Sequence, residues 1–586
     1  MSAEELLAEL DRVEAKRARG LDGSRPDAVA KQHARGKLTA RERVTALADP
    51  GSFVEFGSLI EPARETAFTE DLDAPGDGVV TGTVDIDGRP ASVVSFDFTM
   101  YGGSNGKNGG EKHARATHDA LEHGHPLVLM LEGGGHRIQD GLDSRHFAAA
   151  GNNPGAVGTF AAMARMSGWV PQCAAMLGAG FAGPTNFAGM CDFVVMTRNA
   201  TMGIAGPALV KAATGQSLTN DELGGPAVQA DTYGLADLVV DDDAAAMAAI
   251  RTFLSYLPSN ATRPLPIVPC NDPADRAEDA LLELVPTDQR KGYDIRKVID
   301  LLADRGSTFE LKARFARNIV TTLARLDGRP VGFVANNPGH HAGILDSKAC
   351  DKASHFIALC DAFGLPLVFL IDVPGFLIGP GAERTALGRR SAKLIFELGN
   401  ATVPRAAVVL RKGYGLGYFA MAGGRSFGAD LSVAWPGAEI CAMNVEGAVD
   451  VAYRNDYLAA PDPQARRDEL ITVFKNQRDA LRGAEAFGID DVIDPRHTRR
   501  RLIGTFNRCA PRKLTAFPPR FRTINPLGGR DGGTRSSRPP SPRPPTPSAA
   551  PSAGCATPAP AGPGHVRAAT GRAPSAAAAG PRRRCR

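Results

Sequence analysis

Apolar residues occur along this chain in short runs separated by amphipathic stretches, and one succession of such runs occurs twice. In residues 79–98, VVTGTVDIDGRPASVVSFDF, two apolar runs flank an Asp-Gly-Arg-Pro turn, which predicts two β-strands. A glycine-rich loop and a helical stretch follow, and then the apolar strand PLVLMLE (126–132), which ends in another glycine-rich loop. Strands that alternate with helices predict the α/β class with a mostly parallel sheet.

The second occurrence lies 240 positions later. Asp87-Gly88-Arg89-Pro90 returns as Asp327-Gly328-Arg329-Pro330, and PLVLMLE returns as PLVFLID (366–372). The same spacing relates five further pairs: Lys112 and Lys352, Pro126 and Pro366, Glu132 and Asp372, Gly135 and Gly375, and Gly141 and Gly381. A series held in one register indicates an internal duplication, and therefore two tandem domains of one architecture.

Changes in composition suggest the domain boundaries. The segment LPSNATRPLPIVPC (257–270) holds four prolines, so we expect a first domain over 1–258, a linker over 259–270 and a second domain over 271–515. Residues 526–586 are rich in Pro, Ala and Arg, a composition that cannot build a core and that predicts disorder.

Charge changes the picture only once this tail is set apart. The formal net charge is +4, but the residues from Leu527 onward carry ten Arg and one Asp, so the remaining body is mildly acidic. An acidic body argues against nucleic acid as a partner. The nine cysteines show neither CxxC nor Cys/His metal spacing, which favours a reducing compartment and predicts no metal. The amino terminus lacks an apolar signal core, and we therefore expect a cytoplasmic protein.

One uncharged stretch, residues 166–191, is long enough to cross a bilayer. It contains prolines, Asn186 and many Gly and Ala residues rather than Leu and Ile. This composition predicts a buried strand, a glycine-rich loop and the start of a helix, with no membrane span.

The glycine-rich loops are the chain's best candidate chemistry, since no P-loop, GxSxG, HExxH or biotinyl-lysine motif is present. Besides the loops that follow PLVLMLE and PLVFLID, GAGFAG (178–183) and GYGLG (413–417) each join a predicted strand to a helix. Such turns point backbone N–H groups into a cleft, where they can stabilise an oxyanion such as a thioester enolate. The duplication predicts two such oxyanion holes.

Several segments resemble the carboxyltransferase (β) subunits of biotin-dependent acyl-CoA carboxylases. In the first domain these are GKLTARERVTALADPGSFVEFG (36–57), DFTMYGGSNG (97–106), EGGGHRIQDG (132–141) and ATGQSLTNDELGG (213–225). In the second domain the run from Lys352 to Gly415 is the most specific. The resemblance covers roughly residues 30–515. It implies two crotonase-like (ββα superhelix) domains, in a homo-oligomer expected to be a hexamer, a trimer of dimers.

The resemblance also implies the reaction and the partners. A carboxyl group passes from carboxybiotin, on a separate carrier subunit, to the α-carbon of an acyl-CoA, through enolates held in two backbone oxyanion holes. The partner is a biotin carboxylase and biotin carrier subunit, and ATP is needed only by that partner. A side-chain base is not required.

By position, the family's thioester hole falls on Ala182 and Gly183, and its biotin-side hole on Leu416 and Gly417. Leu416 departs from the family, where a small residue is usual, and a leucine tolerates positive φ poorly. Phe419 stands where the family often has Asp near the acyl pocket, which predicts a different acyl group. Gly134, Gly135 and Arg137 are the expected CoA-binding residues.

Alternatives stay open at several points. Arg137 could contact CoA phosphates or form a salt bridge, and Lys112 and Lys352 could contact phosphate or, as we expect, lie solvated on a helix face. The same fold could serve a biotin-dependent decarboxylase, a plain crotonase-type hydratase, or a non-catalytic paralogue that assembles with an active β subunit. The sequence does not name the acyl-CoA.

Overall fold

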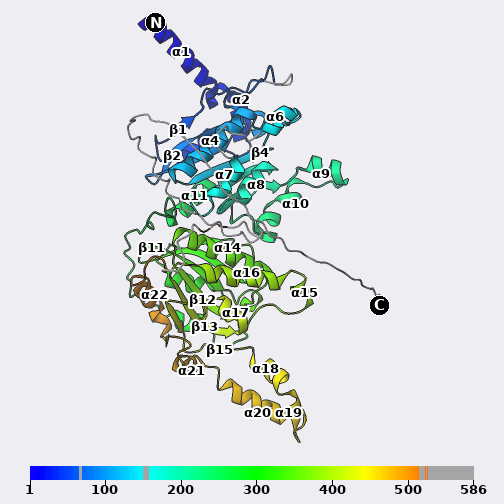
Figure 1. Ribbon diagram of the computed structural model, residues 1–586, viewed down its shortest axis with the longest axis vertical. Coiled ribbons are helices and arrows are strands. Elements are labelled where there is room, and N and C mark those ends of the chain that lie inside the picture. The colour runs from blue at the N-terminus through cyan, green and yellow to red at the C-terminus, as the bar shows by residue number, and fades with distance from the viewer. Residues whose placement is uncertain (65–68, 150–157, 514–521, 523, 525–586) are drawn as a thin grey trace, which may run out of the picture. The chain divides into compact units, whose positions relative to one another are not determined.

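The computed structural model describes residues 1–64, 69–149, 158–513, 522 and 524, and Figure 1 shows how its elements are arranged. Two sheets are present, and they repeat one strand order. The first runs β1-β2-β3-β4-β5-β6-β8, with β7 paired to β5: β1 (Val54–Phe56), β2 (Val79–Ile86), β3 (Arg89–Phe96), β4 (Leu127–Gly133), β5 (Gln172–Phe181), β6 (Phe193–Thr197), β7 (Thr201–Gly203) and β8 (Leu238–Val240).

The second sheet runs β9-β10-β11-β12-β13-β14-β16, with β15 paired to β13. Its strands are β9 (Phe309–Leu311), β10 (Ile319–Leu326), β11 (Arg329–Asn336), β12 (Leu367–Val373), β13 (Arg405–Tyr414), β14 (Leu431–Ala434), β15 (Glu439–Cys441) and β16 (Asp491–Val492). In each sheet the first three strands pair antiparallel and the rest pair parallel. The predicted α/β class and the tandem crotonase-like architecture are confirmed.

Helices follow the strands in the same repeated order. In the first half they are α1 (Ala3–Arg19), α2 (Pro26–His33), α3 (Ala40–Leu47), α4 (Lys107–His123), α5 (Ile138–Gly141), α6 (Ser144–Ala149), α7 (Thr159–Met166), α8 (Gly183–Gly189), α9 (Pro207–Thr214), α10 (Asn220–Gly224) and α11 (Asp243–Tyr256). In the second half they are α12 (Leu281–Leu284), α13 (Arg296–Leu302), α14 (Ser347–Phe363), α15 (Pro380–Glu383), α16 (Leu387–Asn400), α17 (Gly415–Ala420), α18 (Val445–Ala452), α19 (Arg454–Leu458), α20 (Pro463–Lys475), α21 (Ala480–Glu485) and α22 (Thr498–Phe506).

The Asp-Gly turns explain the two hairpins. Asp87 and Gly88 have φ of 51° and 71°, and Asp327 and Gly328 have φ of 53° and 74°, as a two-residue hairpin turn requires. The Asp304 carboxylate accepts the N–H groups of Asp327 and Gly328 at 3.0 and 2.7 Å, and Asp49 holds the first turn in the same way at 3.1 and 2.7 Å. Each turn is thus fixed by a carboxylate from the preceding segment.

The expectation that the repeated lysines lie solvated on a helix face is wrong, because both are buried. Lys112 and Lys352 are 3% and 1% exposed. The Nζ of Lys112 donates to the Val79 carbonyl at 2.6 Å, and that of Lys352 donates to three carbonyls at 2.8–2.9 Å, those of Lys312, Phe315 and Ile319. Burial lowers the pKa of Lys112 to about 8 and that of Lys352 to about 7. Both lysines tie the central helix of a half to the chain at the start of its hairpin.

The uncharged stretch folds as predicted, with β5 over Gln172–Phe181, a turn at Ala182 and helix α8 from Gly183. Across the described ranges, no helix is both long enough and apolar enough to cross a membrane. The predicted domain boundaries remain predictions, and the 526–586 tail lies outside the described residues.

Candidate active site

Each half holds the glycine loop after its central strand with the same two backbone hydrogen bonds. In the first half Asn105 donates its N–H to the Gly135 carbonyl at 2.9 Å, and Arg137 donates to the Asn105 carbonyl at 2.8 Å. In the second half Leu345 donates to Gly375 at 3.1 Å and Leu377 to Leu345 at 2.9 Å. The loops after β4 and β12 are therefore fixed alike.

The turns that follow β5 and β13 are also equivalent, but their spacing along the chain differs. Leu127 of β4 pairs with Gln172 of β5, and Leu367 of β12 pairs with Arg405 of β13, so these strands match at positions 172 and 405. The connection from the central strand is thus shorter in the second half. In this register Ala182 corresponds to Gly415, and Gly183 corresponds to Leu416.

Both turn residues have φ of 58°. Ala182 also has ψ of −114°, a combination that costs an alanine of the order of 1–3 kcal/mol, and strain of this kind is commonly found at functional sites. The Ala182 N–H donates to the Gly203 carbonyl at 2.9 Å and is thereby engaged. Gly183 begins α8, so its N–H has no partner within the helix.

This geometry resolves the question raised by Leu416. The positive φ of the second turn falls on Gly415, where glycine tolerates it, and Leu416 lies inside α17 with no positive φ. Its side chain is 55% exposed. The leucine therefore does not strain the backbone of the loop, contrary to our concern.

The turn and the glycine loop meet closely in both halves. A Cβ added to Gly135 would lie 3.0 Å from Cδ of Pro184 in α8. A Cβ added to Gly417 in α17 would lie 3.0 Å from Cα of Gly375 and 3.1 Å from the Val373 side chain. Gly134 and Gly375 have open space on their Cβ side. Each half thus brings a turn with positive φ and an open glycine loop together at the carboxyl ends of adjacent parallel strands.

Arg137 forms salt bridges, which is one of the two roles that the sequence left open. It is 3% exposed, and its Nη1 lies 2.8 Å from a carboxylate oxygen of Asp77 and 3.4 Å from one of Asp140. Its Nη2 donates to the Ser104 carbonyl at 3.3 Å. A contact with CoA phosphates would have to break these buried ion pairs.

The repeated carboxylates at the ends of the central strands form ion pairs with nearby cations. Glu132 lies 2.5 Å from both Lys37 and Arg43, and Asp372 lies 3.0 Å from Arg411 and 3.5 Å from Lys412. Both acids are at most 1% exposed. The sequence indicated their repetition, but not these partners, which lie far away along the chain. The two carboxylates anchor the loops and are not positioned as bases.

Exposed apolar side chains lie on α17 and on the loop after β12. On α17, Leu416 and Phe419 are 55% and 39% exposed, and a spacing of three residues places them on one helix face. Ile378, from the loop after β12, is 88% exposed. Within the described part of the chain, no group of three or more His, Cys, Asp or Glu side chains is placed to hold a metal ion.

Replacing Ala182 with glycine is expected to raise the free energy of unfolding by about 1 kcal/mol with kcat retained, because glycine adopts this φ and ψ without strain. Ala182→Val should lower it by about 2 kcal/mol, because a β-branched residue tolerates positive φ least. Urea unfolding of both variants measures the difference. Equal stability of all three chains would show that the turn is unstrained.

Comparison with known proteins bears on this site. Residues 31–524 match the family model described as the carboxyl transferase domain. The propionyl-CoA carboxylase carboxyltransferase subunit of Haloferax mediterranei is 40% identical over 500 residues, which cover 84% of this chain and 94% of the relative. The methylmalonyl-CoA carboxyltransferase 12S subunit of Propionibacterium freudenreichii subsp. shermanii is 43% identical over 490 residues, 83% and 91% of the two chains.

A crystal structure of transcarboxylase 12S, described as a hexamer assembly with methylmalonyl-coenzyme A bound, superimposes with a TM-score of 0.82 at 39% identity. The match covers 90% of this chain and 99% of that one. Family model, relatives and fold agree with one another. The chain therefore belongs to the carboxyl transferase family.

Proposed function

We propose that this chain transfers a carboxyl group from biotin, carried on a separate protein, to the α-carbon of an acyl-CoA, using two backbone oxyanion holes. The observation that carries the proposal is the repeated turn, in which Ala182 and Gly415 share a φ of 58° beside equally held glycine loops. Two holes suit a reaction in which both partners develop negative charge on oxygen.

On the first side, the acyl-CoA thioester lies between the Gly134–Gly135 loop and the turn at Ala182. Gly183 would donate its free N–H to the thioester oxygen while the α-proton passes to the bound biotin. Ala182 orients that donor and keeps its own N–H on Gly203. The buried ion pairs of Arg137 hold the loop in place. Backbone donors fixed beforehand stabilise an enolate without reorganising during the reaction.

On the second side, Leu416 and Gly417 are the proposed donors, from the first turn of α17. When bound, biotin supplies the carboxyl group. The residues present fit such a ring: at Gly417 a side chain would collide with Gly375, and the exposed Leu416 side chain of the same helix offers apolar contact. The loop between β12 and α15 and the start of α17 would together exclude water from it.

Phe419 is the residue we expect to restrict the acyl group. It shares the exposed face of α17 with Leu416. In the family this biotin side meets the acyl-CoA side of a neighbouring subunit, so a bulky ring there would limit the space for the acyl group. Phe419→Ala should shift the ratio of kcat/KM between a long and a short acyl-CoA by about tenfold toward the long one, because even one methylene is worth about 1–3 kcal/mol in an apolar pocket. Competition between two acyl-CoAs measures this ratio, and an unchanged ratio would place the ring outside the pocket.

The partners follow from the family. We propose that a biotin carboxylase and biotin carrier subunit supplies the carboxylated biotin, that ATP is consumed only there, and that copies of this chain form a hexamer in the cytoplasm. The hexamer assembly described for transcarboxylase 12S supports the proposed hexamer. Two alternatives remain: the carboxyltransferase component of a biotin-dependent decarboxylase, and a non-catalytic paralogue. The unstrained backbone at Leu416 favours an active site over the paralogue.

The decisive experiment measures fixation of labelled bicarbonate into a panel of acyl-CoAs, with ATP and a biotin carboxylase/carrier subunit. Label in one acyl-CoA establishes the transfer and names the substrate. Leu416→Gly, run beside it, should have the same kcat as the native chain. Activity found only with Leu416→Gly would favour the paralogue, and release of carbon dioxide from a carboxylated acyl-CoA without fixation would favour the decarboxylase.

A further inference from the structure

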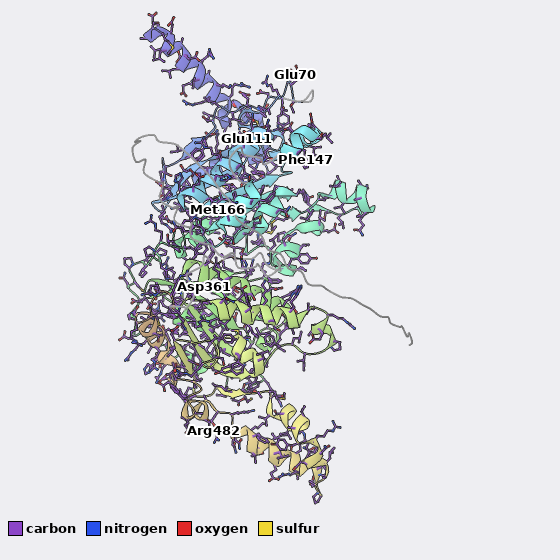
Figure 2. The ribbon with its side chains drawn as sticks, viewed as in Figure 1. Glu70, Glu111, Phe147, Met166, Asp361 and Arg482 are labelled. Atoms are coloured by element: carbon purple, nitrogen blue, oxygen red, sulfur yellow. The ribbon has the colours of Figure 1, made fainter. Side chains whose placement is uncertain are left out.

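Helix α1 lies outside the part of the chain that the family model matches, which begins at residue 31. It has 17 residues and a capping box at Ser2, yet none of its residues is buried. Figure 1 shows it extending away from the nearest sheet, and Figure 2 draws the side chains that project from it. In proteins most of the stability of a helix comes from tertiary packing of its apolar face, and α1 has no such packing within its own chain.

The helix has one apolar stripe. Leu6, Leu7 and Leu10 are 46%, 61% and 49% exposed, and Ala3 and Val13 continue the stripe at helical spacing. The stripe is narrow and passes through the middle of the helix at Leu10. A narrow stripe of this kind is suited to one other helix rather than to a broad surface.

Charge is divided between the two ends of the helix. The amino-terminal half carries the acids Glu4, Glu5, Glu9 and Asp11, and the carboxyl-terminal half carries the bases Arg12, Lys16, Arg17 and Arg19, with Glu14 as the one acid among them. Two such helices side by side in parallel would place like charges together. An antiparallel pair would place the acidic half of each against the basic half of the other.

We propose that α1 forms an antiparallel helix pair with α1 of a second copy of this chain, joined along the Ala3–Leu6–Leu10–Val13 stripe. The pair is symmetric about Leu10: Leu10 of one copy contacts Leu10 of the other, as an isologous contact allows. At its carboxyl-terminal end α1 is held to its own chain by Glu61, which lies 3.2 Å from Arg19 and 3.8 Å from Lys16. The proposal concerns a contact between copies and does not rest on the catalytic function.

Disulfide cross-linking in the full-length chain tests the pairing. Leu10→Cys should yield at least about ten times more linked dimer on mild oxidation than Ala8→Cys, which lies on the opposite face of the same helix. The native chain, with its nine cysteines, gives the background. Mixed copies of Ala3→Cys and Arg17→Cys should link to each other rather than to themselves.

Charge reversal in the Leu10→Cys background tests the orientation. The combined change Glu4→Lys, Glu5→Lys and Glu9→Lys should lower the yield of linked dimer several-fold, as should Arg12→Glu, Lys16→Glu and Arg17→Glu. Mixing the two variants should restore it. Equal yields from Leu10→Cys and Ala8→Cys would overturn the pairing, and links within Ala3→Cys copies alone would overturn its antiparallel direction. Circular dichroism checks that each variant is folded.

Discussion

Replacing Leu416 with proline is expected to lower kcat by at least about a hundredfold, the usual cost of one lost oxyanion donor. Proline removes the proposed N–H donor at position 416. It should do so with little damage to the fold, because Leu416 lies in the first turn of α17, where proline costs no intrahelical hydrogen bond. The preceding Gly415 has no Cβ to collide with the proline ring.

The matched controls are Leu416→Ala and Leu416→Gly, which delete the side chain and keep the N–H. Both should retain kcat within about threefold, since the backbone at this position is helical and needs no particular side chain. Bicarbonate fixation measures kcat, and thermal unfolding confirms that all three variants fold. A proline variant as active as the alanine variant would remove Leu416 from the list of donors.

Much of the fold was predictable because the sequence contains an internal duplication. The Asp-Gly turns, the apolar central strands and the glycine loops recur at one spacing, so each half supports the interpretation of the other. Local chemistry was sufficient here: an Asp-Gly pair at positive φ determines a hairpin, and a run of apolar residues determines a buried parallel strand.

The site was predicted less completely, and the reason is geometric. The spacing of 240 no longer holds after the central strands, because the connections from β4 to β5 and from β12 to β13 differ in length. Only strand register shows that Gly415, and not Leu416, carries the positive φ. Likewise the acceptors of Lys352 are backbone carbonyls that the fold brings close to it. Because every residue has a backbone carbonyl, the sequence does not indicate which ones accept.

Arg43→Met is expected to lower the free energy of unfolding by about 3–5 kcal/mol, the usual cost of removing one partner from a buried ion pair. Arg43 is fully buried, with its Nε 2.8 Å from Asp243 and its Nη2 2.5 Å from Glu132. After the change Glu132 keeps Lys37, but Asp243 keeps only the Leu38 N–H at 3.1 Å. Arg305→Met, at a solvent-exposed arginine, should change stability by less than about 0.5 kcal/mol.

The pH dependence separates lost charge pairing from lost packing. Burial raises the pKa of Asp243 and Arg43 opposes this rise, so without Arg43 that pKa must rise further. A carboxyl whose pKa is higher in the folded chain destabilises it when ionised, and protonation removes that cost. The deficit of Arg43→Met should therefore shrink as the pH falls, whereas a packing defect would leave it constant. Glu132 directly precedes the first glycine loop. Measuring kcat of Arg43→Met at neutral pH and at the lowest pH at which the chain stays folded would show whether the buried charges also hold the oxyanion donors in place.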